Sequence, residues 1–402
     1  MVNYRTPQSH QNSSLSTTFA VMQNQQRIVF IDIARTIAIL LMLQGHFITM
    51  TYSDYGTRLH ELRTTGTSGL LLFDIWVRVR GFTAPLFFTI TGLVFTYLML
   101  KGNTTDTQHF WKKKRVTRGL KRASQLIIVG YLLQINLMNV PFYFRGGYSP
   151  NLFAFHILQC IGFGLLLLIS IAWLSQKTRL NVSVLLFLTG SFFFVGHAFL
   201  QYKFGNELWL PKQIPVLFQN MLNGPKANFP FFPWLGFVGF GGFLGSLIFK
   251  FSAHLHQRWF PLVFVGIAVL IVVFGKTVGF SIDWLLGETT PFFLKRAWLF
   301  DKVAEAILLL GILLTIEQYV TVRPSTLLSM GQNTFAIYNV HAILLYGAIT
   351  GISLRTFLEH QLNGWQSVVG AFLFLTTIYL YVKYMELINR PIFKVLPSYF
   401  SS

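Results

Sequence analysis

The sequence predicts an all-α fold, a polytopic integral membrane bundle of about ten transmembrane helices. Hydrophobic residues make up 53% of the 402 residues and charged residues only 11%, against about 25% charged in an average soluble domain. The mean hydropathy is +0.54. The apolar residues gather in runs of roughly 20, the length that a helix needs to cross a bilayer. Together these observations exclude a soluble globular enzyme and a disordered chain, and the single cysteine, Cys160, excludes a disulfide scaffold.

The chain divides into a short polar tail and one membrane domain. Residues 1–26 are rich in Gln, Ser, Thr and Asn and lack the apolar stretch of a signal peptide, which predicts a disordered cytosolic tail. Residues 27–402 form a single transmembrane domain with no separate soluble part. Its predicted spans are approximately 28–50, 81–100, 119–139, 152–174, 180–201, 230–249, 260–280, 299–319, 327–350 and 367–388. The sixth span is rich in glycine, which favours close helix packing in lipid.

The positive charges predict how the domain sits in the membrane. The net charge is +19, and seven Lys or Arg residues lie at 112–122, between the second and third spans. Such clusters stay on the cytoplasmic side, so both termini are expected in the cytosol. The outer segments also carry some basic residues, Arg58 and Lys212 among them. An excess of Lys and Arg in cytoplasmic loops explains the positive net charge better than binding to a nucleic acid does.

The first span carries three polar side chains that share one helical face. At about 100° per residue, Arg35 and His46 lie ~20° apart, and Asp32 lies within ~60° of both. Asp32 and Arg35 are spaced to form an ion pair, which either locks helix packing or orients a substrate. His46 lies ~16 Å further along the helix, near the outer end. Its imidazole is a candidate general base, with an interhelical hydrogen bond as the structural alternative.

Polar residues in other spans extend this candidate site. Arg80 opens the second span near the depth of His46, where it binds a saccharide or an anionic intermediate, or extends to lipid headgroups. Asn339 and His341 lie in the ninth span, two positions apart, so only one of them is expected to face His46. His156, at the start of the fourth span, is interpreted as an interfacial residue.

No metal site is predicted, because His254 and His256 lack a third ligand. No nucleophile elbow or phosphate-binding loop appears either. The basic cluster at 112–122 has two interpretations. It either sets topology and binds lipid headgroups, or it captures the phosphates of an anionic cofactor such as coenzyme A. The residues for the second interpretation are Lys113, Arg115, Arg118 and Arg122.

Several motifs occur in an order that covers most of the chain. They are 32–46 (DIARTIAILLMLQGH), 80–92 (RGFTAPLFFTITG), 115–120 (RVTRGL), 156–162 (HILQCIG), 232–236 (FPWLG) and 330–341 (MGQNTFAIYNVH). In this order they resemble the bacterial membrane proteins related to heparan-alpha-glucosaminide N-acetyltransferase. The family's Arg-Gly is Arg35-Thr36 here, which predicts looser helix packing at that point. The family's lumenal branch has Asn at the position of His46, with a histidine further along, and His60 is the nearest later histidine here.

The resemblance implies a transmembrane acyltransferase fold in the bacterial inner membrane. Such proteins take an acyl group, usually acetyl, from cytosolic acyl-coenzyme A and pass it to a glycan amine or hydroxyl outside the cytoplasm. Acetyl-CoA is then the co-substrate and no metal is needed. The expected partners are membrane lipids and a saccharide acceptor, with a homodimer left open. The family's outer histidine corresponds to His46, its acidic and arginine residues to Asp32 and Arg35, and its last histidine motif to His341.

The mechanistic hypothesis assigns a role to each candidate. Basic residues of the cluster at 112–122 hold the coenzyme phosphates, and His46 acts as base or carries the acyl group itself. Asn339, His341 or Arg80 orients His46 or stabilises the oxyanion. Three other functions remain: an O-acyltransferase of cell-envelope polysaccharide, a transporter or flippase for a lipid or glycan, and a silent scaffold. Many transporters have spans broken by Gly or Pro at corresponding positions of their two halves. The sequence shows no such pair of spans, which disfavours the transporter.

Overall fold

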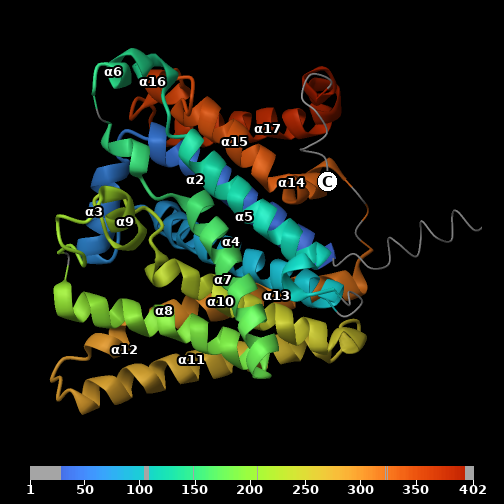
Figure 1. Cartoon of the computed structure of the whole chain (residues 1–402). Helices are drawn as coiled ribbons and strands as arrows, with labels where there is room; N and C mark the ends of the chain where they lie inside the picture. Colours follow the sequence, from blue (N-terminus) through green and yellow to red (C-terminus); the bar gives the residue numbers. More distant parts are fainter. Residues whose placement is uncertain are drawn as a thin grey trace, which may run out of the picture.

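The computed structural model describes residues 29–103, 108–147, 149–205, 207–321, 323 and 325–393. The predicted tail at 1–26 lies outside these residues. Within the described residues the chain is helical, with isolated bridges and no strand (Figure 1). The long helices are α2 (Val29–Thr51), α4 (Leu71–Asn103), α5 (Lys114–Leu132), α7 (Ile157–Thr178), α8 (Val182–Phe204), α10 (Phe231–Lys250), α11 (Phe260–Leu285), α13 (Trp298–Tyr319) and α17 (Gly364–Phe393).

Shorter helices connect the long ones and gather mainly at one end of the bundle, the left side of Figure 1. They are α3 (Tyr55–Thr65), α6 (Val140–Phe144), α9 (Val216–Leu222), α12 (Phe292–Arg296) and α16 (Leu354–Leu358), with the 3-10 turn η3 (Pro150–Phe153). The opposite end holds the start of α2, the end of α4 and the start of α5. We call it the basic end, because the cluster at 112–122 lies there.

Seven helices in the described part of the chain are long and apolar enough to cross a membrane: α2, α4, α7, α8, α10, α11 and α17. The all-α membrane bundle is therefore confirmed. The other three predicted spans are also helical, but each departs from a continuous apolar helix. The N-terminal half of α5 is basic, and α13 carries four charged residues. The ninth span is broken at Asn333 into α14 (Thr326–Gln332) and α15 (Thr334–Tyr346).

Glycines bring α4 and α10 into close contact, as the sequence predicted. A Cβ atom on Gly241 would overlap the carbonyl oxygen of Thr89, and one on Gly245 would overlap that of Leu93. No side chain larger than hydrogen fits between these two backbones. The pair lies inside the main hydrophobic core, beside α8.

The expectation of looser packing at Thr36 is wrong. Thr36 is buried, and its hydroxyl donates to the carbonyl of Leu327 at 3.3 Å. A Cβ atom on Gly331 of α14 would overlap the backbone carbonyl of Asp32. The close contact is therefore kept, because the glycine that permits it lies on the partner helix instead of on α2.

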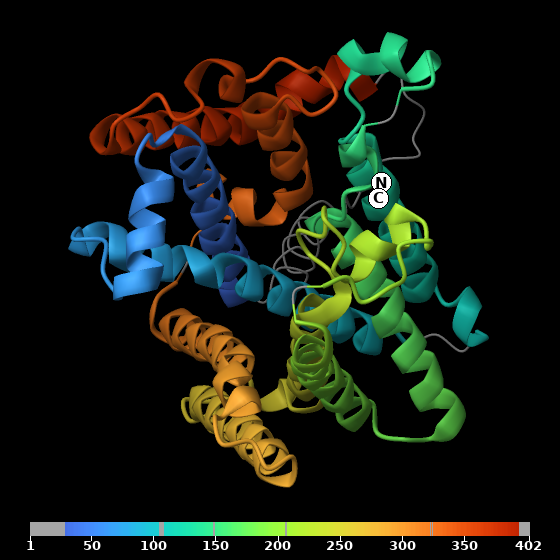
Figure 2. The ribbon, with the colours of Figure 1, turned by 90° about the vertical axis from the view of Figure 1, so that its left-hand side faces the viewer.

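A second, smaller core joins α2 to the C-terminal helices. It contains Ile39 and Leu43 of α2, Ile337 of α15 and Phe374 of α17. Figure 2 shows α14, α15 and α17 beside α2 along one edge of the bundle, away from α11 and α13. The helices α5 and α7 pack against each other elsewhere in the bundle. The space between α2–α15 and α5–α7 is where the candidate site lies.

Candidate functional site

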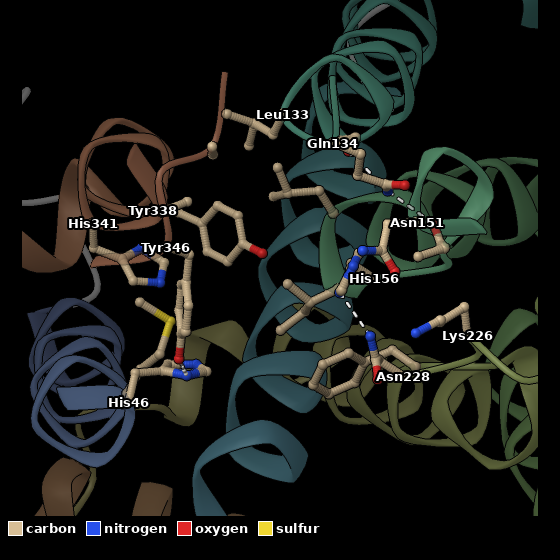
Figure 3. A pocket seen from close by; sticks show the side chains of 18 of the residues that line it. His46, Leu133, Gln134, Asn151, His156, Lys226, Asn228, Tyr338, His341 and Tyr346 are labelled. Carbon is tan, nitrogen blue, oxygen red and sulfur yellow. Dashed lines mark hydrogen bonds between the residues drawn. The ribbon is translucent and has the colours of Figure 1, made fainter. Parts of the chain in front are cut away.

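A cavity of about 1070 Å³ opens between two walls at the end of the bundle opposite the basic end. One wall comes from α2 and α15, and the other from the end of α5, η3, the start of α7 and the loop before α10. Figure 3 shows His46 and His341 on the first wall and Gln134, His156 and Asn228 facing them. Tyr55 and Arg80 complete the lining from α3 and α4.

The first wall brings together two histidines and two tyrosines. The ring centroids of His46 and His341 lie 5.5 Å apart, and those of Tyr338 and His341 lie 4.8 Å apart. Tyr338 and His341 share a face of α15 because they are three residues apart. Of Asn339 and His341, only His341 meets His46, as their spacing predicted. Asn339 is not among the residues that line the cavity.

Tyr346 fixes the orientation of His46. Its hydroxyl lies 2.7 Å from His46 Nδ1, and the two rings meet edge to face. The tautomer decides which of the two groups donates. When His46 Nδ1–H donates to the phenol oxygen, His46 Nε2 carries the lone pair and is free to accept a proton. Tyr346 is close enough because α15 ends beside α2, at Gly347 in the left-handed conformation.

Arg80 lies across the backbone of α2 beside His46. A Cβ atom on Gly45 would come within 3.2 Å of Arg80 Nε, so Gly45 leaves the room that this side chain occupies. Arg80 Nη1 donates to the hydroxyl of Tyr55 at 2.8 Å, and the guanidinium lies 5.8 Å from the ring centroids of Tyr55 and Trp76. Arg80 therefore faces the cavity rather than extending to lipid.

The second wall contains polar residues that the sequence analysis did not select. His156 was interpreted as interfacial, but it lines the cavity and its Nδ1 lies 3.0 Å from Nδ2 of Asn228. Burial lowers the pKa of His156, which favours the neutral ring. Gln134 donates to the carbonyl of Ala154 at 2.8 Å. Nothing in the spacing of the sequence marks these residues, because their partners are distant in the chain.

Asp32 and Arg35 form the predicted ion pair, near the basic end and outside the cavity. Arg35 Nη1 lies 3.7 Å from Asp32 Oδ1. Gln332 of α14 donates to the other carboxylate oxygen at 3.3 Å. The pair thus joins α2 to α14, which supports a packing role.

The basic cluster does not form one surface. Lys113 is buried, whereas Arg115 and Arg118 are exposed. Arg122 turns inward, with its guanidinium 4.3 Å from the ring centroid of Phe335 in α15 and in electrostatic contact with Arg35. Arg122 and Arg35 therefore bring positive charge into the bundle at the basic end.

Three further histidines that the sequence raised lie away from the site. His60 is exposed on α3 and does not line the cavity. His254 and His256 lie in the loop after α10. Among the residues that the structure describes, no group of three His, Cys, Asp or Glu side chains could hold a metal ion.

A comparison with known protein families shows to which family the chain belongs. A model described as "Heparan-alpha-glucosaminide N-acetyltransferase, catalytic" matches residues 27–278, more than half of the chain. The chain belongs to this family. No curated protein matches it with significance. Membership identifies a membrane acetyltransferase of saccharides, and the family in general depends on acetyl-CoA.

The family match covers only part of the site. His46, Arg80 and His156 lie inside residues 27–278, as do Asp32 and Arg35. His341 and Tyr346 lie beyond it. The first wall of the cavity therefore combines a histidine from the matched catalytic region with residues that the C-terminal helices add.

Proposed function

We propose that this family member transfers an acetyl group from acetyl-CoA to a hydroxyl or amine of a saccharide bound in the cavity. The observation that carries the proposal is the pairing of His46 with His341 in a cavity of about 1070 Å³, with His46 oriented by Tyr346. A neutral imidazole with one fixed nitrogen is suited to take a proton from a saccharide hydroxyl or a neutral amine.

The donor enters from the basic end. Arg122 faces the bundle interior there, the half-buried Arg35 lies beside it, and Arg118 lies one helical turn before Arg122. Arginine binds phosphate oxygens through paired hydrogen bonds, so these residues fit the phosphates of acetyl-CoA. Lys113 and Arg115 are the further cationic candidates of the same segment. About 16 Å separates Arg35 from His46 along α2, a distance suited to the extended pantetheine arm.

The chemical step moves one proton and one acyl group. His46 Nε2 takes the proton of the acceptor hydroxyl or amine. At the same time, the acceptor oxygen or nitrogen forms a bond to the acetyl carbonyl carbon. The carbon–sulfur bond then breaks, and the proton passes to the departing coenzyme A sulfur. Arg80 and His341 stand beside His46 to stabilise the oxyanion or hold the acceptor. In a two-step variant, His46 itself carries the acetyl group before the acceptor takes it.

The membrane orientation follows from the charges. The basic end lies in the cytosol, where acetyl-CoA is made, and the cavity lies on the outer side of a bacterial inner membrane. Both chain termini are then cytosolic. This arrangement delivers acetyl groups to a glycan that acetyl-CoA cannot reach directly.

The substitution His46→Ala tests the proposal. In purified protein, we expect loss of acetyl transfer from acetyl-CoA to saccharides by about 100-fold or more, because general base catalysis contributes on that scale. His60→Ala is the matched control, since His60 is exposed and lies outside the cavity. Wild-type transfer by a folded His46→Ala variant would remove His46 from the mechanism.

The same assay separates the remaining functions. Transfer in detergent excludes a protein that only transports or flips a glycan, because detergent leaves no compartment to transport into. Radiolabel retained on the protein after acetyl-[14C]CoA alone supports the acetyl-histidine route. Its absence after rapid quenching supports direct transfer.

A further inference from the structure

Besides His341 Nδ1 on the first wall, four buried polar atoms on three other side chains that line the cavity lack hydrogen-bond partners. They are Thr83 Oγ1, Gln134 Oε1 and both side-chain atoms of Gln159, Oε1 and Nε2. Each is buried, and none has a partner among the residues that the structure describes. A buried polar atom without a partner costs free energy, so side chains in this state at a cavity wall are suited to bind a ligand or water there.

Gln159 is the centre of this group. Its side chain is 0% exposed, and it is held against α5, where a Cβ atom on Gly130 would lie 2.7 Å from its amide carbon. The glycine therefore lets α5 approach and fixes the amide in place. A primary amide offers two donor hydrogens and an acceptor oxygen, which match the hydroxyl groups of a sugar ring.

The charges around the cavity have only one sign. Four cationic side chains line it: Arg63, Arg80, Lys226 and Arg355. Among the described residues, no Asp or Glu lines it. Glu359 neutralises Arg355 through a hydrogen-bonded ion pair beside the cavity, but Lys226 stands on the second wall near Asn228 (Figure 3). Such a field attracts anions and repels a protonated amine.

We propose that the second wall is the acceptor subsite, that Gln134 and Gln159 bind the sugar ring there, and that it selects a saccharide with an anionic group. An acceptor that carries a positive charge is then disfavoured. Lys226 pairs with the anionic group. This inference rests on the proposed acetyl transfer and narrows the class of saccharides that can act as its acceptor.

The test compares three soluble acceptors: a neutral saccharide, a saccharide with a carboxylate or phosphate, and glucosamine. Wild-type protein should give the highest kcat/KM with the anionic saccharide. Lys226→Gln should reduce that preference by about threefold to tenfold, because an exposed cation contributes modestly. Lys212→Gln is the control, as Lys212 is exposed and lies outside the cavity.

Gln159→Glu gives a readout that misfolding cannot imitate. The variant keeps the size of the side chain and adds the carboxylate that the cavity lacks. We expect the ratio of kcat/KM for glucosamine over the anionic saccharide to rise at least tenfold, with the KM for acetyl-CoA unchanged. Gln159→Ala should raise the acceptor KM in the same way for all three acceptors.

The outcomes separate the two proposals. If the wild type transfers acetyl groups but prefers glucosamine, and the Gln159 and Lys226 variants leave acceptor kinetics unchanged, the subsite proposal is wrong and the acetyltransferase proposal stands. If the wild type transfers acetyl to none of the three and does not hydrolyse acetyl-CoA, the function itself fails.

Discussion

At the scale of residues, the hydrogen bond between Tyr346 and His46 Nδ1 leaves Nε2 as the imidazole nitrogen that would face the acceptor in the proposed mechanism. A base works only when its lone pair points at the proton that it removes. Tyr346 contributes this orientation from the end of α15, 300 positions away in the chain. Its role is therefore to position His46, and it can be separated from the role of His46 itself.

Tyr346→Phe removes the hydroxyl and leaves the ring. We expect kcat to fall about tenfold while the KM for acetyl-CoA stays the same, because the lost hydrogen bond orients the base and does not hold the donor. Steady-state kinetics against both substrates measures this, with Tyr384→Phe on the exposed face of α17 as the control. An unchanged kcat would show that His46 is held by its packing alone.

The sequence predicted the two histidines and Arg80, but not Tyr346 or Gln159. His46 and His341 are ionisable groups within apolar spans. Such groups are costly in a membrane and need a structural or functional reason, so the hydropathy pattern was enough to select them. Tyr346 lies among apolar residues at the end of a span, and Gln159 resembles any polar residue that packs between helices. Their positions depend on contacts between distant segments, such as Gly130 against Gln159. Single-sequence reasoning has no access to such contacts.

At the scale of helices, the break between α14 and α15 lets one predicted span serve two purposes. The short α14 packs on α2 through Gly331, and Gln332 binds the carboxylate of Asp32. After the break, α15 carries Tyr338 and His341 to the cavity. The apolar pattern of 327–350 predicted a single helix, because hydropathy does not register the change of direction at Asn333.

Gly331→Ala tests this junction. The added methyl group would overlap the carbonyl oxygen of Asp32, so α14 must move away from α2. We expect destabilisation by about 1–3 kcal/mol, as in other overpacked interiors, seen as a lower melting temperature in detergent. Gly266→Ala is the matched control, because a Cβ atom there meets no neighbour within 4 Å. Equal melting temperatures for the two variants would contradict a tight α2–α14 contact.

At the scale of the whole molecule, the basic cluster at 112–122 and the cavity lie at opposite ends of the bundle. The net charge of +19 predicted only a basic membrane protein, whereas the structure divides the cationic side chains by location. Arg115 and Arg118 are exposed, which suits a role in topology. Arg122 turns inward, and the half-buried Arg35 lies close enough for their positive charges to interact, where topology does not require them. A donor that reaches the cavity from the basic end must pass these two residues first.

Arg122→Gln therefore tests whether the donor binds between the two ends. Losing a charge-assisted contact with a phosphate should raise the KM for acetyl-CoA about tenfold, with kcat and the acceptor KM unchanged. Arg118→Gln should have a smaller effect, because that side chain is exposed to water and its interactions are screened. Arg258→Gln, an exposed position at the same end, controls for the loss of one positive charge. Equal KM values in all three variants would leave the basic cluster with a topological role only, and the donor would have to enter by another route.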